Sequence, residues 1–258
     1  MFSLGVILLM INSIDSCDLY VGFITDLSSG NSNFIKPIQA AENIAIYEIN
    51  NDNSLLPNCT IIPSIVDSKS NVSNVIYGAL QLLGQEIDDN DIVNDDILDA
   101  NISTINVPFV MGAALSSLSS YLNPILRTFN ILQISASATS EALTPPQGLS
   151  PLLYFNRVVP SDALQSRGLL ELCLYFNWTN IGVLYVNDPY GIYLFGDIST
   201  QASQIPGFQV TGVSFDSNSN KSIKAGVEGI KTSNVWVTIL IVHHGDVKSV
   251  VQNLKDAD

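Results

Sequence analysis

The chain has 258 residues and a formal net charge of −14, from 24 acidic and 10 basic residues. Its 47% hydrophobic and 13% charged residues are typical of a globular protein with a large core, not of a disordered one. Nucleic acids and anionic membrane surfaces both call for a basic patch, so the acidic balance argues against these partners.

The first segment is apolar from Phe2 to Ile11 and then becomes small and polar. This length suits the core of a signal peptide, because a membrane-spanning helix needs roughly 20 apolar residues. We therefore expect residues 1–17 to be a signal peptide, with cleavage between Ser13 and Cys17, although no basic residue follows Met1. A buried first strand or helix is the alternative.

After Asp18, strand-like and helix-like segments alternate. Extended segments are predicted over 19–25, 60–67, 107–111, 131–135, 154–159, 181–186, 208–215 and 235–242. Helices are predicted over 34–50, 71–85, 116–129, 163–176, 190–202, 223–232 and 246–255. This alternation predicts an α/β protein with parallel sheets and helices on both faces. A break in the rhythm near Tyr154 predicts two lobes, over 18–157 and 158–258. Pro124 predicts that its helix is bent or starts late.

The cysteines and acidic residues indicate no metal site. The spacing of Cys17, Cys59 and Cys173 leaves disulfides open, and Cys173 lies on an apolar helix face typical of a core thiol. The acidic segment from Glu86 to Asp99 lacks the glycine that a calcium-binding loop requires. We expect a solvated segment there.

Catalytic motifs are missing from the sequence. It has no Gly-x-Ser-x-Gly elbow, no phosphate-binding loop and no Gly-x-Gly-x-x-Gly turn, so we expect neither an enzyme nor a cofactor. His243 and His244 are adjacent near a strand end, where neighbouring side chains point to opposite faces. A loop with a helix cap at Asp246 is the favoured interpretation, and an α/β enzyme that uses the histidines is the alternative.

Asn-x-Ser/Thr sequons support secretion only weakly, because a chain rich in Asn and Ser produces several by chance. They begin at Asn58, Asn71, Asn101, Asn177 and Asn220.

Two hydroxyl-rich turns follow neighbouring predicted strands. Ser116 and Ser117 open the helix after residues 107–111, and Ser137, Thr139 and Ser140 follow residues 131–135. Ligands of open parallel sheets lodge at the carboxyl ends of strands, where free N–H groups attract anions. These turns therefore favour a site for a small carboxylate, and plain N-capping is the alternative for either turn alone.

Several segments, in this order and spacing, resemble the ligand-binding region of class C G-protein-coupled receptors, which has the fold of type I periplasmic binding proteins. They are INNDNSLLPN, MGAALSSLSSYLNPILRTFNI, LQISASATSEAL and YFNRVVPSDALQSRGLLELCLYFNWTNIGVLYVNDPYG. Metabotropic glutamate receptors are the most similar class members, and GABA-B-type receptors are also similar. The resemblance covers nearly everything after Asp18.

The resemblance implies that two lobes close on an amino-acid-like ligand. By its motifs, Ser116 matches a serine that binds the ligand carboxylate, and Ser137 and Thr139 match a hydroxyl pair that holds the carboxylate and the amine. Asp162 matches an acidic residue near the ligand ammonium, and Tyr190 matches an aromatic residue that stacks on the ligand. A cation over an aromatic face gains about 0.5–2 kcal/mol.

Three departures from the family pattern matter. Ile38 stands where the glutamate receptors have an arginine for a distal carboxylate, with Lys36 nearby but out of register. Ser70 replaces a cysteine of the family's disulfide. The chain stops at Asp258 inside the second lobe, so we expect a fragment.

The resemblance implies a cell-surface location, with membrane attachment only through a further C-terminal part, and a homodimer formed through first-lobe helices. The alternatives with the same fold are a secreted, soluble solute-binding protein and the ectodomain of a receptor guanylate cyclase or an ionotropic glutamate receptor. Seven hydrophobic spans downstream would select the G-protein-coupled receptor.

Overall fold

A computed structural model describes residues 17–28, 32–84, 107–144 and 154–256, without side chains for 32–36. The expected signal peptide up to residue 16, the acidic segment after Glu86 and the sequon at Asn101 lie outside the described residues. The chain divides into two compact units. Unit 1 comprises described residues up to 114, then 121–136 and 154–156, and unit 2 comprises 115–120, 137–144 and 157–256.

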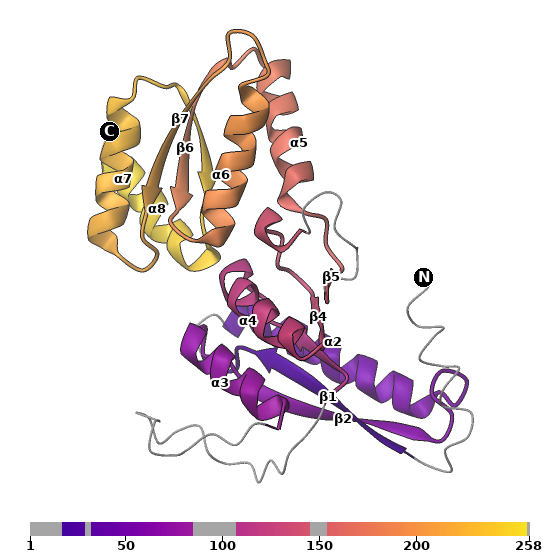
Figure 1. The fold of residues 1–258 in the computed structure, drawn as a ribbon. Helices are drawn as coiled ribbons and strands as arrows, with labels where there is room; N and C mark the ends of the chain where they lie inside the picture. The colour runs from indigo at the N-terminus through magenta and orange to yellow at the C-terminus, as the bar shows by residue number, and fades with distance from the viewer. Residues whose placement is uncertain (1–16, 29–31, 85–106, 145–153, 257–258) are drawn as a thin grey trace. The chain divides into compact units, whose positions relative to one another are not determined.

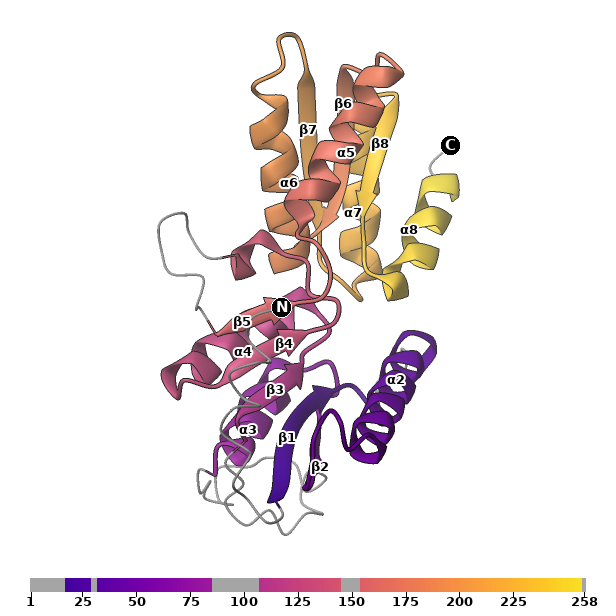
Figure 2. The same ribbon diagram turned by 90° about the vertical axis from the view of Figure 1, so that its right-hand side faces the viewer.

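Unit 1 is built on a five-stranded sheet of order β2-β1-β3-β4-β5. Its strands are β1 (Cys17–Thr25), β2 (Cys59–Asp67), β3 (Phe109–Gly112), β4 (Leu132–Ser135) and β5 (Phe155–Arg157). The β1/β2, β1/β3 and β3/β4 pairs are parallel. The helices are α2 (Ser32–Asn51), α3 (Val72–Leu82) and, from residue 121 onward, α4 (Ser116–Thr128). Figure 2 shows α2 on one side of the sheet and α3 on the other.

The β1/β2 ribbon is fixed at several points. Cys17 and Cys59 are register partners at the start of the two strands and form a disulfide with a Cα–Cα distance of 4.5 Å. From α2, the Asn50 side chain donates to the carbonyl of Ile61 at 3.0 Å and accepts from its N–H at 2.7 Å. Because Val21 and Ile24 are each only 1% exposed, β1 lies in the core of the unit.

Unit 2 has a three-stranded parallel sheet of order β7-β6-β8. The strands are β6 (Asn180–Val186), β7 (Gln209–Phe215) and β8 (Val237–Ile241). The helices are η3 (Glu141–Leu143), α5 (Asp162–Tyr175), α6 (Pro189–Ala202), α7 (Asn220–Thr232) and α8 (His244–Asp256). Figure 1 shows the long helices surrounding this sheet.

Alternate side chains of β6 enter two separate cores. Ile181 and Val183 pack with Leu170 and Cys173 of α5 and with α6, whereas Leu184 and Val186 pack with α7 and α8. Burial on both faces explains why β6 reads as a continuous apolar run. Cys173 is 3% exposed, which confirms the prediction of a core thiol.

The α/β fold with parallel sheets flanked by helices is confirmed. The helix that contains Pro124 does not start late, because α4 begins at Ser116 and continues through Pro124 to Thr128. The other predicted effect of Pro124, a bend in the helix, stays a prediction. The division into lobes at residue 157 stays a prediction. Within the described part of the chain, no helix is long and apolar enough to cross a membrane.

Candidate functional site

All five predicted site residues belong to unit 2. Ser116 begins α4, and Ser137 and Thr139 lie half-buried in the turn that follows β4. Asp162 is the first residue of α5 and Tyr190 the second residue of α6. Helix starts therefore supply three of the five residues, and helix starts favour anionic groups of ligands.

The Ser116 hydroxyl joins the two hydroxyl-rich turns. Its Oγ accepts from the N–H of Thr139 at 3.1 Å and from the N–H of Ser140 at 3.2 Å, and the residue is only 5% exposed. Ser116 thus binds the next turn instead of capping its own helix. Two N–H groups converge on one oxygen, which is the arrangement that a carboxylate oxygen requires.

Ser140 and Arg157 hold the second turn in place; the sequence predicted Ser140 only as part of the hydroxyl-rich turn, and it did not predict Arg157. The fully buried Ser140 accepts from the N–H of Ala142 at 3.2 Å, which caps η3, and donates to the carbonyl of Pro189 at 3.1 Å. The Arg157 guanidinium donates to the carbonyls of Thr139 at 2.8 Å and Ser140 at 2.9 Å. Burial lowers the pKa of Arg157, although neighbouring acids oppose this. Ser140 is therefore an N-cap, which is the alternative interpretation that the sequence left open for this turn.

Asp162 is attached to the same turn by its backbone, because its N–H donates to the carbonyl of Thr139 at 2.9 Å. The residue is 0% exposed, and within the described residues neither carboxylate oxygen has a hydrogen-bond partner. Burial raises the pKa of Asp162, while the nearby Thr139 hydroxyl and the Arg157 charge offset part of this effect. A buried carboxylate without a partner is costly for a fold, so the position calls for an explanation.

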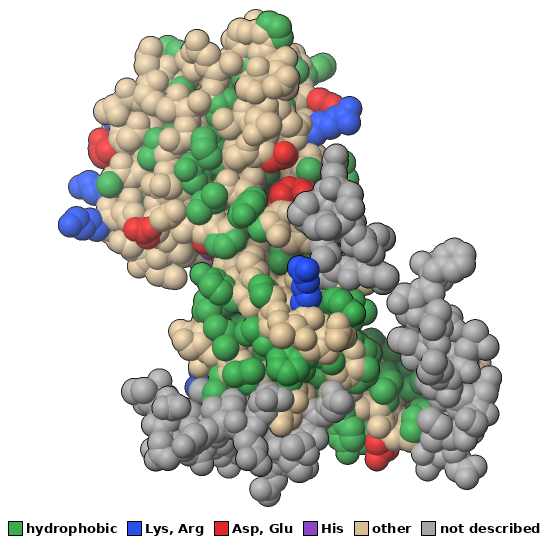
Figure 3. All heavy atoms as spheres, in the orientation of Figure 1, with side chains coloured by type: hydrophobic (Ala, Val, Ile, Leu, Met, Phe, Trp, Pro, Cys, Tyr) green, Lys and Arg blue, Asp and Glu red, His purple; other side chains and the backbone are tan. Residues whose placement is uncertain are grey.

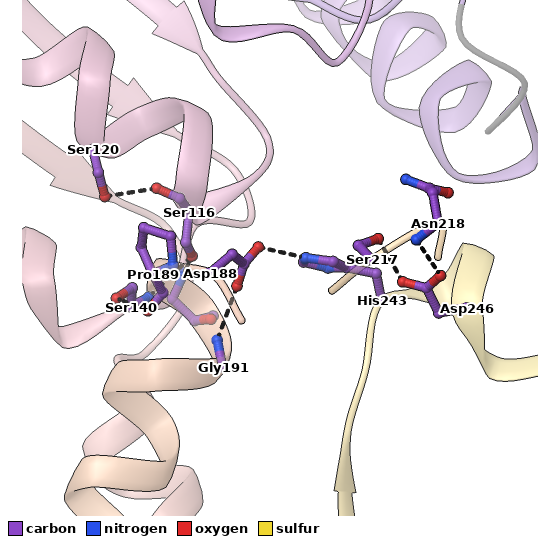
Figure 4. A network of polar contacts seen from close by, with 11 residues as sticks. Ser116, Ser120, Ser140, Asp188, Pro189, Gly191, Ser217, Asn218, His243 and Asp246 are labelled. Atoms are coloured by element: carbon purple, nitrogen blue, oxygen red, sulfur yellow. Dashed lines mark hydrogen bonds and ion pairs between the residues drawn. The ribbon is translucent and has the colours of Figure 1, made fainter. Parts of the chain in front are cut away.

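Tyr190 lies against a histidine that was not predicted to belong to the site. The ring of His243 stacks on Tyr190 with centroids 5.6 Å apart. Its Nε2 lies 2.6 Å from Oδ2 of Asp188, as Figure 4 shows. The other carboxylate oxygen of Asp188 accepts from the N–H of Gly191 at 3.0 Å and caps α6. Burial and the charges of Asp162 and Asp188 raise the pKa of Tyr190, which keeps the phenol neutral.

The prediction of a helix cap at Asp246 is wrong. Because β8 ends at Ile241 and α8 begins at His244, Asp246 lies inside the first helical turn. It is 3% exposed and accepts from the Ser217 hydroxyl at 2.6 Å and from the N–H of Asn218 at 3.0 Å (Figure 4). Asp246 therefore fixes the loop after β7 instead of capping its own helix.

Gly191 lets α6 start directly against the end of β6. A Cβ atom at this position would clash with the carbonyl oxygen of Val186, so only glycine fits. The close approach sets the position of Asp188 and Tyr190, which flank the turn. Among the described residues, no group of three or more His, Cys, Asp or Glu is placed to hold a metal ion.

Residues 38–258 match the family described as "Receptor family ligand binding region". The chain belongs to this family. It is 29% identical over 154 residues to the probable metabotropic glutamate receptor mgl-1 of Caenorhabditis elegans, covering 57% of this chain and 15% of the relative. It is 30% identical over 156 residues to the metabotropic glutamate receptor of Drosophila melanogaster, covering 58% of this chain and 16% of the relative.

These relatives confirm the resemblance to the ligand-binding region of class C receptors. The chain is thus a receptor-type ligand-binding region, and its matched part spans about one sixth of each relative's length. Both relatives are named as receptors, and neither is named as an enzyme.

Proposed function

We propose that this chain binds an amino-acid-like small ligand at the cluster of Ser116, Ser137, Thr139, Asp162 and Tyr190. The observation that carries the proposal is the fully buried carboxylate of Asp162, which lacks a hydrogen-bond partner among the described residues. A ligand ammonium would supply the missing donors and the opposite charge. This pairing removes the penalty of a buried unpaired charge.

The opposite end of the ligand is recognised by the hydroxyl turns. The N–H groups of Thr139 and Ser140 already converge on the Ser116 hydroxyl. A ligand carboxylate at this point accepts from the same N–H donors and from the hydroxyl itself. Since Thr139 also binds the backbone of Asp162, one turn sets the spacing between the carboxylate and ammonium subsites.

Tyr190 supplies a ring face for the ligand, and His243 sets the orientation of that ring. His243 acts through Tyr190 and Asp188 and is therefore a positioning residue in this proposal. An ammonium over the Tyr190 ring gains about 0.5–2 kcal/mol. The raised pKa of Tyr190 keeps this surface uncharged.

The ligand's side chain need not carry an acid. Two relatives are named as glutamate receptors, but by the family resemblance Ile38 replaces the arginine that would hold a distal carboxylate. We infer that an α-amino acid with an uncharged side chain binds at least as well as L-glutamate.

We further propose that ligand binding shifts an equilibrium between open and closed lobes. Asp162 is out of reach of solvent in this structure, so ligand entry needs a conformation in which the carboxylate is accessible. The Cys17–Cys59 disulfide supports an extracellular location, because such bonds persist in oxidising compartments. We also propose that the protein is attached to a membrane and that it forms a dimer through helices of the first lobe.

Isothermal titration of the full chain tests the proposal, with L-alanine and L-glutamate as the two probes. We expect at least one amino acid to bind, while propionate and ethylamine, which lack the ammonium or the carboxylate, do not. Asp162→Asn and Ser116→Ala are expected to reduce affinity at least 10-fold, which corresponds to about 1.4 kcal/mol.

Matched controls are Glu171→Gln and Tyr193→Ala, which change an exposed acid of α5 and an exposed aromatic residue of α6. Normal affinity in Asp162→Asn and Ser116→Ala would contradict the site. A chain that is folded by circular dichroism but binds neither probe nor the other α-amino acids would contradict the function.

A further inference from the structure

An exposed aromatic cluster lies where α5 ends and β6 begins. It comprises Tyr175, Phe176 and Trp178, which are 82%, 50% and 38% exposed. The Phe176 ring contacts Tyr175 edge-on, with centroids 5.0 Å apart, and stacks on Trp178 at 4.8 Å. Stacked rings that stay open to solvent mark a surface that another group covers.

Trp236 is a further exposed aromatic residue, and it lies just before the start of β8 in the same sheet. It is 95% exposed and precedes Val237, whose register partner in β6 is Ile181. The side-chain amide of Asn180 also reaches the carbonyl of Asn234 at 3.4 Å, which ties the two strand starts together. Figure 3 shows charged side chains scattered between hydrophobic and other polar side chains on the face of unit 2 that it draws.

Asn177 lies in the middle of the cluster and begins the sequon Asn177-Trp178-Thr179. Its φ of 58° and the bond from its N–H to the carbonyl of Leu174 at 3.0 Å place it just after the end of α5, in the left-handed conformation common there. Asn177 and Thr179 are both exposed. Within the described part of the chain, the Asn177 side-chain amide makes no hydrogen bond.

The other described sequons differ, because each contains a residue with a structural task. The Asn71 amide oxygen caps α3 by accepting from two N–H groups. The Asn220 amide oxygen accepts from Ser249 at 3.1 Å and Asn253 at 3.0 Å in α8. The sequon at Asn58 contains Cys59, which is 7% exposed and disulfide-bonded. Among the sequons in the described residues, Asn177 is thus the position where an added group disturbs no contact of these kinds.

We propose that Asn177 carries an N-linked glycan whose first sugar lies on the rings of Phe176 and Trp178. The donor is a polyprenyl-diphosphate-linked oligosaccharide. The Asn177 Nδ2 atom bonds to the anomeric carbon of the first N-acetylglucosamine, that carbon's bond to the diphosphate oxygen breaks, the polyprenyl diphosphate leaves, and Nδ2 loses one proton. The glycan adds a hydrated layer to this exposed aromatic surface.

The rings of Phe176 and Trp178 form a platform for the sugar, and this explains why the surface is aromatic instead of generally apolar. The C–H groups on one face of a pyranose pack flat on a ring, while its hydroxyls stay in water. Phe176 precedes Asn177 and Trp178 follows it, so the sugar and the rings share one turn of backbone. Aromatic contacts of this type gain stability beyond that of the buried area alone.

Glycopeptide mapping of the full chain made in a eukaryotic secretory system tests the modification. We expect a glycan on Asn177 of the wild-type chain, its loss in Asn177→Gln and Thr179→Ala, and its retention in Thr179→Ser. Unmodified Asn177 in the wild-type chain recovered from the secretory pathway would overturn the proposal. Because the mapping needs no variant, misfolding of a variant does not affect the result.

Thermal unfolding tests the platform separately. Removal of the sugar, by making the wild-type chain without N-glycosylation, is expected to lower the Tm by about 2–4 °C relative to the chain whose glycan is trimmed to a single N-acetylglucosamine. In Phe176→Ala the same removal should have no effect, whereas Tyr193→Ala, an exposed ring of α6, should respond like the wild type. Equal shifts in Phe176→Ala and the wild type would show that the sugar does not use the rings.

Discussion

The Nε2 atom of His243 lies 2.6 Å from Oδ2 of Asp188, and Oδ1 of the same Asp188 caps α6 through the N–H of Gly191 at 3.0 Å. One carboxylate therefore links the end of β8 to the start of α6. The side chains of His243 and Asp188 are only 24% and 19% exposed, so bulk solvent weakens this link less than it would a surface pair. The link positions Tyr190, which stacks on the histidine.

The pair makes the stability of unit 2 depend on pH. Its hydrogen bond to Asp188 raises the pKa of His243, despite the opposing effect of burial. The stabilisation is therefore complete below the unfolded pKa of about 6.5 and is lost as pH rises through the higher folded pKa. We expect His243→Gln to lose about 1–2 kcal/mol at pH about 5.5 and much less at pH about 8.5. Denaturant unfolding at both pH values measures this difference.

The exposed His244 gives the matched control, because His244→Gln removes a neighbouring imidazole that no described residue binds. A proton NMR titration of Asp188→Asn is the second test, since the pKa of His243 should fall when the acceptor is neutral. An unchanged titration in that variant would show that Asp188 does not raise the pKa.

We expect the buried carboxylate of Asp162 to serve ligand binding and to lower the stability of the fold. Burial raises its pKa, so the folded state loses stability as pH rises from the unfolded pKa of about 3.8 through the folded value. Asp162→Asn keeps the shape and removes the charge, and we expect a gain of about 1–3 kcal/mol at neutral pH. Urea unfolding of this variant and of Glu171→Gln measures the gain, and a less stable Asp162→Asn would contradict it.

Glu42 in α2 is expected to destabilise unit 1 when it ionises. Burial raises its pKa from 4.5 to about 7. Because the folded pKa is the higher one, stability declines between pH 4.5 and about pH 7 as the carboxyl loses its proton. Glu42→Gln should therefore gain on the order of 1–3 kcal/mol at pH about 8 and almost nothing at pH about 4. The exposed Glu48 in the same helix is the control, and a pH-independent gain would contradict this explanation.

The Cys17–Cys59 disulfide closes a loop with a sequence separation of 42 residues. A bond of this span stabilises a fold by about 2–4 kcal/mol, mainly by restricting the unfolded chain. We expect mild reduction to lower the midpoint of urea unfolding for unit 1, while Cys17→Ser should match the reduced wild type and no longer respond to reductant. A chain whose unfolding is insensitive to reductant would contradict the prediction.

The sequence predicted the elements of the fold well because each carries a strong periodic signal. The apolar run at Ile181–Val186 and the helical spacing around Ala41 and Ile49 are local patterns. The pairing of Cys17 with Cys59 is different, because it depends on the register of β1 against β2, which no local pattern contains. The helix over 116–129 was predicted with Pro124 inside it, and α4 does continue through this proline, so only the late start that the proline suggested did not occur.

The sequence predicted a site residue when its turn was recognisable locally, and it missed a residue when the contacts that matter are far away in the sequence. Ser116, Thr139 and Asp162 stand in recognisable turns, and the fold brings them together. His243 was missed because strand geometry was applied to a residue that lies in a turn between β8 and α8. Its partner Asp188 is 55 residues away in sequence, so only the sheet order β6-β8 reveals the pair.

The contact of Gly191 with the end of β6 limits how this receptor region can acquire a new preference. Any larger residue there would push α6 away from the Val186 carbonyl and would displace Asp188 and Tyr190 together. A lineage that changes ligands must therefore leave this backbone turn intact and replace side chains around it, one at a time. A change of the ring that packs on Tyr190 from the turn after β8, that of His243, would alter the ligand surface without moving the backbone turn at Gly191.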